Sequence, residues 1–144
     1  MNNKKIRKDV IKEKLGSIID TLEVIRENLP DDFEDFYKSR ILKDAVYKEI
    51  EFCIESILDI CSIINTDLKL GVPELEDSIL DNIEKKKIFE KKAVELIKEM
   101  KKFRNILVHK YGNVNDEQAF ENIKDGLDNF DAIIEEFERF LDKH

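Results

Sequence analysis

The sequence predicts an all-α protein, an up-and-down four-helix bundle with a short additional helix. Three observations lead to this fold class. Apolar residues recur at helical spacing in four long segments, only 4 glycines and 2 prolines interrupt the chain, and 40% of residues are charged. Such a composition suits long amphipathic helices, and we find no strand pattern. The 144 residues, 42% of them hydrophobic, fit one domain over residues 1–144 with one core.

The first two helices are predicted from this apolar spacing. The first spans about residues 4–29, and its apolar stripe consists of Ile11, Leu15, Ile18, Leu22, Ile25 and Leu29. Pro30 ends it. The second helix begins at Asp32 or Ser39 and continues to Asn65. Its apolar positions include Leu42, Val46, Ile50, Cys53, Ile57, Ile60 and Ile64.

The second half of the chain holds a break, a short helix and two long helices. Residues 67–73, which end in Gly71-Val72-Pro73, form the break, and a short helix follows at about 74–84. The next helix spans about 88–110 and ends before Gly112. Its stripe is Phe89, Ala93, Leu96, Met100, Phe103 and Leu107. Asn115 with Gln118 resembles a capping box that begins the last helix. That helix carries Phe120, Ile123, Leu127, Phe130, Ile134, Phe137 and Leu141.

Charge is unevenly distributed along the chain. The formal net charge of −8 argues against non-specific nucleic-acid binding by the whole surface. Residues 85–110, however, hold ten lysines and arginines against three glutamates, and residues 115–144 hold ten acidic residues against three basic ones. A charge run is usually a solvated helix face, so the basic segment gains meaning only from the motif it contains.

The two cysteines and the N-terminus indicate a cytoplasmic protein without a metal site. Cys53 and Cys61 lie eight residues apart on one predicted helix. This separation is roughly 12 Å along the axis, too far for a disulfide. No cysteine–histidine cluster suggests zinc, and the sequence predicts no metal and no cofactor. The N-terminus lacks the apolar core of a signal peptide, and no apolar run is long enough to span a membrane.

His109 is the candidate catalytic residue, near the end of the basic helix. The simplest explanation of a single histidine there is structural, because a cationic imidazole favours the helix dipole and can cap free carbonyls. Its neighbours suggest more. Asn105 and His109 form an i, i+4 pair on a face that points away from the apolar stripe. Arg104 and Tyr111 lie on or beside that stripe, where an arginine needs a partner.

This helix therefore has two predicted faces. One packs into the bundle, and the other, with Val94, Asn105, Ile106 and His109, is available to a second chain or a ligand. Arg104 and His109 are about 140° apart on a straight helix. Either the reach of the arginine, a distorted last turn, or a two-fold homodimer that contributes copies from both chains would bring them together. We expect the homodimer, because small homo-oligomers are usually two-fold.

The motif itself resembles a known family. The pattern R-N-x-x-x-H-x-Y, formed by Arg104, Asn105, His109 and Tyr111, resembles the R-x4–6-H signature of HEPN domains. Its extended form R-x4-H-x-Y is similar to that of the HepT-like toxins, which are paired with small MntA-like nucleotidyltransferases. The segment from Ile50 to Asp59 is similar to the helix that precedes the motif helix in that branch.

The resemblance implies a metal-independent endoribonuclease toxin. Its substrate would be RNA, whose ribose 2′-OH attacks the adjacent phosphate. His109 would act as general base or acid, because imidazole exchanges protons near neutral pH. Arg104 would hold the phosphate, and Asn105 would orient His109 or the phosphate. The RNA-binding track would consist of Lys101, Lys102 and Lys110.

The resemblance further implies a partner and a modification. A small nucleotidyltransferase antitoxin would neutralise the protein and transfer adenylyl groups to Tyr111. Two alternatives remain open from sequence. In the first, the chain is a non-catalytic HEPN module that docks the nucleotidyltransferase, with Tyr111 as the modified group. In the second, it is a structural bundle without a site. A basic motif helix with Arg, Asn and His at one end disfavours the purely structural alternative.

Overall fold

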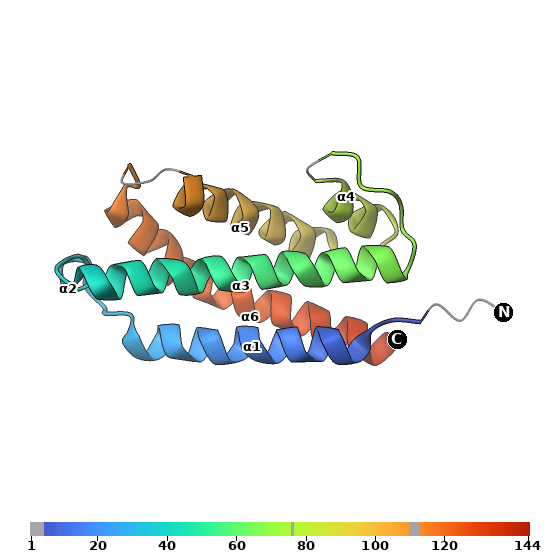
Figure 1. The fold of residues 1–144 in the computed structure, drawn as a ribbon, viewed down its shortest axis with the longest axis horizontal. Coiled ribbons are helices and arrows are strands. Elements are labelled where there is room, and N and C mark those ends of the chain that lie inside the picture. Colours follow the sequence, from blue (N-terminus) through green and yellow to red (C-terminus); the bar gives the residue numbers. More distant parts are fainter. Residues whose placement is uncertain (1–4, 76, 110–112) are drawn as a thin grey trace.

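The computed structural model describes residues 5–75, 77–109 and 113–144, and most of them are helical (Figure 1). In the described chain the helices are α1 (Lys8–Asn28), α2 (Phe33–Tyr37), α3 (Arg40–Asp67), α4 (Ser78–Lys85), α5 (Lys91–His109) and α6 (Asp116–Lys143). The four long helices α1, α3, α5 and α6 alternate in direction, as an up-and-down bundle requires. The predicted all-α fold class is confirmed.

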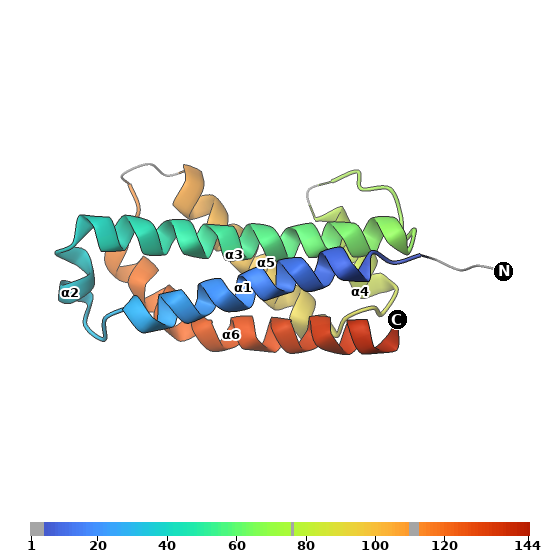
Figure 2. The same cartoon turned by 60° about the horizontal axis from the view of Figure 1, so that its bottom comes forward.

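The long helix α3 is the centre of the arrangement. It packs against α1 along one side and against α5 along another, while α6 passes behind α3 in Figure 1 and contacts both α5 and α1 (Figures 1 and 2). The short helix α2 lies at the end of the bundle where α5 ends and α6 begins. The motif segment therefore lies at one end of the bundle, and the start of α1 and the end of α6 lie at the other.

The sequence predicted two possible starts for α3, and the structure shows that Ser39 is its N-cap. The Ser39 side chain accepts a hydrogen bond from the Leu42 amide at 3.2 Å, as an N-cap does. Residues 33–37 form the separate helix α2, whose Phe36 is fully buried against Tyr47 and Phe120. Aromatic burial thus fixes five residues that have too few turns to be stable alone.

The connection between α3 and α4 is held by two asparagines. The Asn65 Nδ2 donates to the Gly71 carbonyl at 2.9 Å, and the Asn82 Nδ2 donates to the Asn65 Oδ1 at 3.1 Å. Gly71 has a φ of 154°, and a Cβ there would approach the Asn82 Nδ2 to 2.9 Å. Only glycine fits this turn without strain. These two hydrogen bonds hold the connection that leads into α4, which packs against α5. Helix α4 begins at Ser78 rather than near residue 74.

The core is a continuous layer of aliphatic and aromatic side chains from all six helices. Both cysteines lie in it and are free, as predicted. Burial raises the pKa of the Cys53 and Cys61 thiols to about 12, so neither supplies a thiolate at neutral pH. Over the described ranges, none of the helices is long and apolar enough to cross a membrane.

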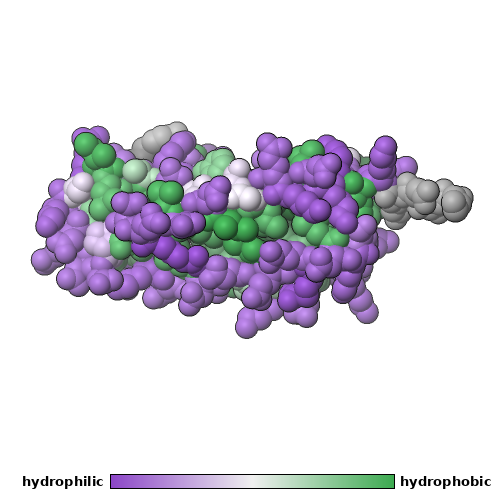
Figure 3. Space-filling model, turned by 90° about the horizontal axis from the view of Figure 1, so that it is seen from below, coloured by the Kyte–Doolittle hydropathy of each residue, from purple (hydrophilic) through white to green (hydrophobic). Residues whose placement is uncertain are grey.

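One face of the bundle shows apolar side chains between polar margins (Figure 3). Across the described bundle as a whole, the exposed hydrophobic residues of α1 and α3 include Val10, Ile19, Val24, Ile41 and Phe52. Single exposed apolar side chains are common on soluble proteins, and we assign no function to this face.

Candidate functional site

The predicted motif lies on the part of α5 that is least covered by the bundle. The buried residues of α5 are Ala93, Val94, Ile97 and Met100. From residue 101 to residue 109 every side chain is half-buried or exposed, and Ile106 is 40% exposed. The C-terminal half of α5 therefore offers accessible surface on more than one side, which agrees with the expectation of a second face.

The prediction that Val94 belongs to this open face is wrong. Val94 is fully buried, so the first half of α5 is covered on this side as well, and α4 is among the helices that pack against α5. Two ion pairs strengthen this contact: Lys98 reaches Asp81 at 2.6 Å, and Lys101 reaches Asp77 at 3.0 Å. The second face of α5 is thus confined to its last turns.

Arg104 lies between α5 and α3. Its side chain is 22% exposed, and its Nη1 is 3.9 Å from the Glu55 Oε1 on α3. The sequence predicted that Arg104 needs a partner, and Glu55 is that partner, although the distance between their charged atoms is long. The Arg104 Nε is buried without any hydrogen-bond partner, and among the described side chains it is the one such atom. A buried guanidinium donor without an acceptor is costly, so an anion at this position would stabilise it.

His109 points to a different side of α5 from Arg104. The two residues are five positions apart, which is about 140° around the helix and about 7.5 Å along it. His109 is exposed, and Asn105, one turn earlier on nearly the same side, is half-buried. Within one chain, then, Asn105 and His109 lie together, whereas Arg104 faces Glu55 and α3.

The predicted RNA-binding lysines differ in their surroundings. The Lys101 side chain is only 13% exposed and pairs with Asp77. The Lys102 side chain is 73% exposed, and its Nζ is 3.5 Å from the Glu99 Oε1. An exposed pair of this kind contributes little and exchanges readily for another anion. Lys102 is thus placed to meet a phosphate, whereas Lys101 would first have to leave Asp77. Lys110 and Tyr111 lie outside the described residues.

The chain that follows the motif is anchored to α3 through Asp116. The Tyr47 hydroxyl donates to the Asp116 Oδ1 at 2.6 Å, and the Lys43 Nζ is 3.2 Å from the Asp116 Oδ2. Asn115 caps α6, as predicted, by accepting from the Gln118 amide at 3.1 Å. Burial and the Asp116 carboxylate raise the pKa of Tyr47 well above its usual value, so its hydroxyl remains a donor.

We expect Tyr47→Phe to destabilise the beginning of α6. The change removes one hydrogen bond to a carboxylate and should lower the free energy of unfolding by about 1 kcal/mol. Urea denaturation measures this loss, and hydrogen exchange should show faster opening at residues 116–119. Tyr37→Phe is the matched control, because Tyr37 is 54% exposed. Equal stability of the two variants would contradict the assigned anchor.

Sequence reasoning missed the acidic partners of the site. Glu55 lies on the outer side of α3, and Asp77 precedes α4. Sequence spacing marks Glu55 as solvent-facing but does not show which helix packs beside it. In the portion of the chain that is described, no three histidine, cysteine or acidic side chains gather in a way that could hold a metal ion.

Comparisons with known proteins agree with this arrangement. A family model described as Ribonuclease HepT-like matches residues 18–137. The mRNA nuclease HepT of Shewanella oneidensis is 24% identical over 127 residues, which are 88% of this chain and 95% of that protein.

Solved structures show the same fold. A tri-AMPylated Shewanella oneidensis HEPN toxin, in complex with an MNT antitoxin, superimposes with a TM-score of 0.79 at 23% identity, covering 96% of this chain and 99% of the toxin. A Bacillus subtilis cytosolic protein of unknown function superimposes with a TM-score of 0.79 at 20% identity. The match covers 96% of this chain and 92% of that protein.

Proposed function

Because the chain belongs to the Ribonuclease HepT-like family, we propose that it is an endoribonuclease toxin that a nucleotidyltransferase antitoxin neutralises. The observation that carries the proposal is the R-x4-H motif on the uncovered end of α5, where the Arg104 Nε lacks an acceptor. A substrate phosphate would supply that acceptor. The names of the Shewanella relatives, an mRNA nuclease and a HEPN toxin, support the same activity.

The reaction requires proton transfer and charge stabilisation. The ribose 2′-OH attacks the adjacent phosphorus, the P–O5′ bond breaks, and a 2′,3′-cyclic phosphate and a 5′-OH result. His109 removes the 2′-OH proton or protonates the departing 5′-oxygen, and a water molecule carries out the other of these two proton transfers. Arg104 binds the phosphate oxygens, whose charge increases in the transition state, and Asn105 orients the imidazole or the phosphate. The test is incubation of purified protein with RNA in excess EDTA, with cyclic-phosphate ends as the expected product.

Arg104 and His109 point to different sides of α5, and this arrangement supports a homodimer. A two-fold axis beside the last turns of α5 would place His109 of one copy opposite Arg104 of the other. We expect light scattering at micromolar concentration to give twice the 17.0 kDa of one chain. A mass of one chain under these conditions would contradict the homodimer. Arg104 and His109 would then have to act within a single copy, although they point to different sides of α5.

We expect a partner nucleotidyltransferase to adenylylate Tyr111. The tri-AMPylated state of the Shewanella toxin supports this expectation. A bulky anionic group two residues after His109 would compete with RNA for Arg104 and Lys102 by charge and by volume. Co-expression with the nucleotidyltransferase should add mass to Tyr111, and Tyr111→Phe should remain toxic in its presence. Full neutralisation with an unmodified Tyr111 would mean that the partner inhibits by docking alone.

The proposal includes a location. One structurally similar protein is described as cytosolic. We therefore place the ribonuclease in the cytoplasm, where its RNA substrate occurs.

A further inference from the structure

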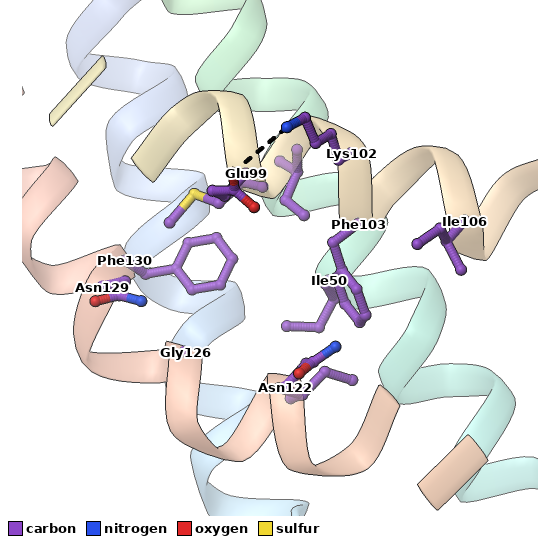
Figure 4. Close-up of a pocket in the computed structure, with 12 residues that line it drawn as sticks. Ile50, Glu99, Lys102, Phe103, Ile106, Asn122, Gly126, Asn129 and Phe130 are labelled. Atoms are coloured by element: carbon purple, nitrogen blue, oxygen red, sulfur yellow. Dashed lines mark hydrogen bonds and ion pairs between the residues drawn. The ribbon is translucent and has the colours of Figure 1, made fainter. Parts of the chain in front are cut away.

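An apolar groove lies between α3, α5 and α6, beside the motif (Figure 4). Its volume is about 420 Å³. The lining residues on which its chemistry depends are Lys102, Phe103, Ile106, Asn122, Gly126 and Phe130. A smaller cavity of about 230 Å³ shares Phe103, Ile106 and Asn122 and extends to residues 113–115. The groove therefore continues toward the chain that follows the motif.

The groove has the chemistry of a site for a flat, mostly apolar group with polar edges. Phe103 from α5 and Phe130 from α6 extend into the same space (Figure 4). Between them, the Asn122 amide points into the groove. Its Oδ1 accepts from the Gln118 Nε2 at 3.1 Å, which leaves the Nδ2 hydrogens for a ligand. Volumes of roughly 300–1,000 Å³, apolar walls and a few polar groups are typical of small-ligand sites.

Gly126 keeps one side of this groove open. It lies inside α6, where a glycine costs roughly 1 kcal/mol relative to alanine. A Cβ at this position would meet no atom within 4 Å, so packing inside the bundle does not require the glycine. A larger side chain at position 126 would project beside the groove and reduce the space that a ligand can enter.

The groove borders the side of α5 that carries His109. Lys102 and Ile106 form its edge and lie seven and three positions before His109, which places them on neighbouring turns of nearly the same side. The exposed ammonium of Lys102 is at this edge. A nucleotide whose base entered the groove would thus bring its phosphate toward Lys102 and His109.

We propose that this groove binds one nucleobase of the RNA, next to the cleaved phosphate. The base contacts the Phe103 and Phe130 rings, and its edge accepts hydrogen bonds from the Asn122 amide. The assignment rests on the proposed ribonuclease function for its substrate. The two aromatic rings and the one amide that line the cavity match an unstacked base.

The test is titration of nucleoside 5′-monophosphates into the full-length, ¹⁵N-labelled protein. At least one of AMP, GMP, CMP and UMP should shift the Asn122 side-chain signals and the amides of residues 123–130. Ribose 5-phosphate, which lacks the base, should leave them unchanged. Gly126→Leu, which fills the groove without removing any contact, should weaken binding about tenfold or more. Gly16→Leu is the matched control, because Gly16 lies inside α1 with equally open space and should bind like wild type.

Several outcomes separate this proposal from the proposed function. If nucleotides shift no signals in α6, or if Gly126→Leu binds as wild type does, the groove is not a base site. If Gly126→Leu changes the molecular mass in light scattering, a second copy occupies the groove and the proposal is overturned. If the wild-type protein binds nucleotides in this groove but cleaves no RNA, the base site is supported and the proposed ribonuclease activity is contradicted.

Discussion

His109→Ala is expected to lower the rate of RNA cleavage by about 10²–10⁴-fold, because the variant loses the general acid–base group. His109 is exposed at the last turn of α5, so its removal leaves no cavity and no unpaired partner in the described structure. The folded protein should therefore persist. Single-turnover cleavage of a labelled RNA measures the rate, and circular dichroism with thermal melting measures the fold.

His144→Ala is the matched control for this prediction. His144 is the other histidine of the chain, and its ring packs against Phe140 with the centroids 4.5 Å apart, at the opposite end of the bundle. The His144→Ala variant should cleave RNA at the wild-type rate. Retained cleavage in His109→Ala would show that the proton is transferred elsewhere and that the R-x4-H motif is not catalytic here.

Arg104→Ala is expected to reduce cleavage by about 10²–10³-fold, the usual effect of removing one group that stabilises transition-state charge. Arg104→Lys should recover only part of this loss, because an ammonium cannot bind two phosphate oxygens in parallel as a guanidinium does. The alanine variant removes a donor that is buried without an acceptor, and Glu55, half-exposed on α3, remains hydrated. We therefore expect unchanged thermal stability.

Arg40→Ala is the control for a lost arginine charge, because Arg40 is 90% exposed at the beginning of α3. It should leave cleavage unchanged. If Arg104→Ala unfolds at a clearly lower temperature than wild type, then Arg104 contributes to the fold through Glu55. If Arg104→Ala is less stable but the folded variant cleaves RNA at the wild-type rate, Arg104 has no role in the reaction.

The local pattern of the sequence determined most of the fold. Stripes such as Ile11 to Leu29 predicted α1, because a helix that buries one side needs apolar residues every three or four positions. Capping residues set the boundaries: Asn115 begins α6, and Ser39 was one of two predicted starts of α3. Helix α2 could not be predicted in this way, because its five residues are stabilised by aromatic contacts with α3 and α6.

The sequence by itself also determined the candidate motif, since Arg104, Asn105 and His109 lie within two turns of one helix. Only the tertiary structure decided what surrounds them. It buried Val94 under α4, paired Lys101 with Asp77, placed Glu55 beside Arg104 and left the groove next to Ile106. The physical reason is that helical periodicity tells which side of a helix is apolar, whereas the partners of its polar residues come from distant segments. Those partners depend on how the helices pack against one another, which no local pattern specifies.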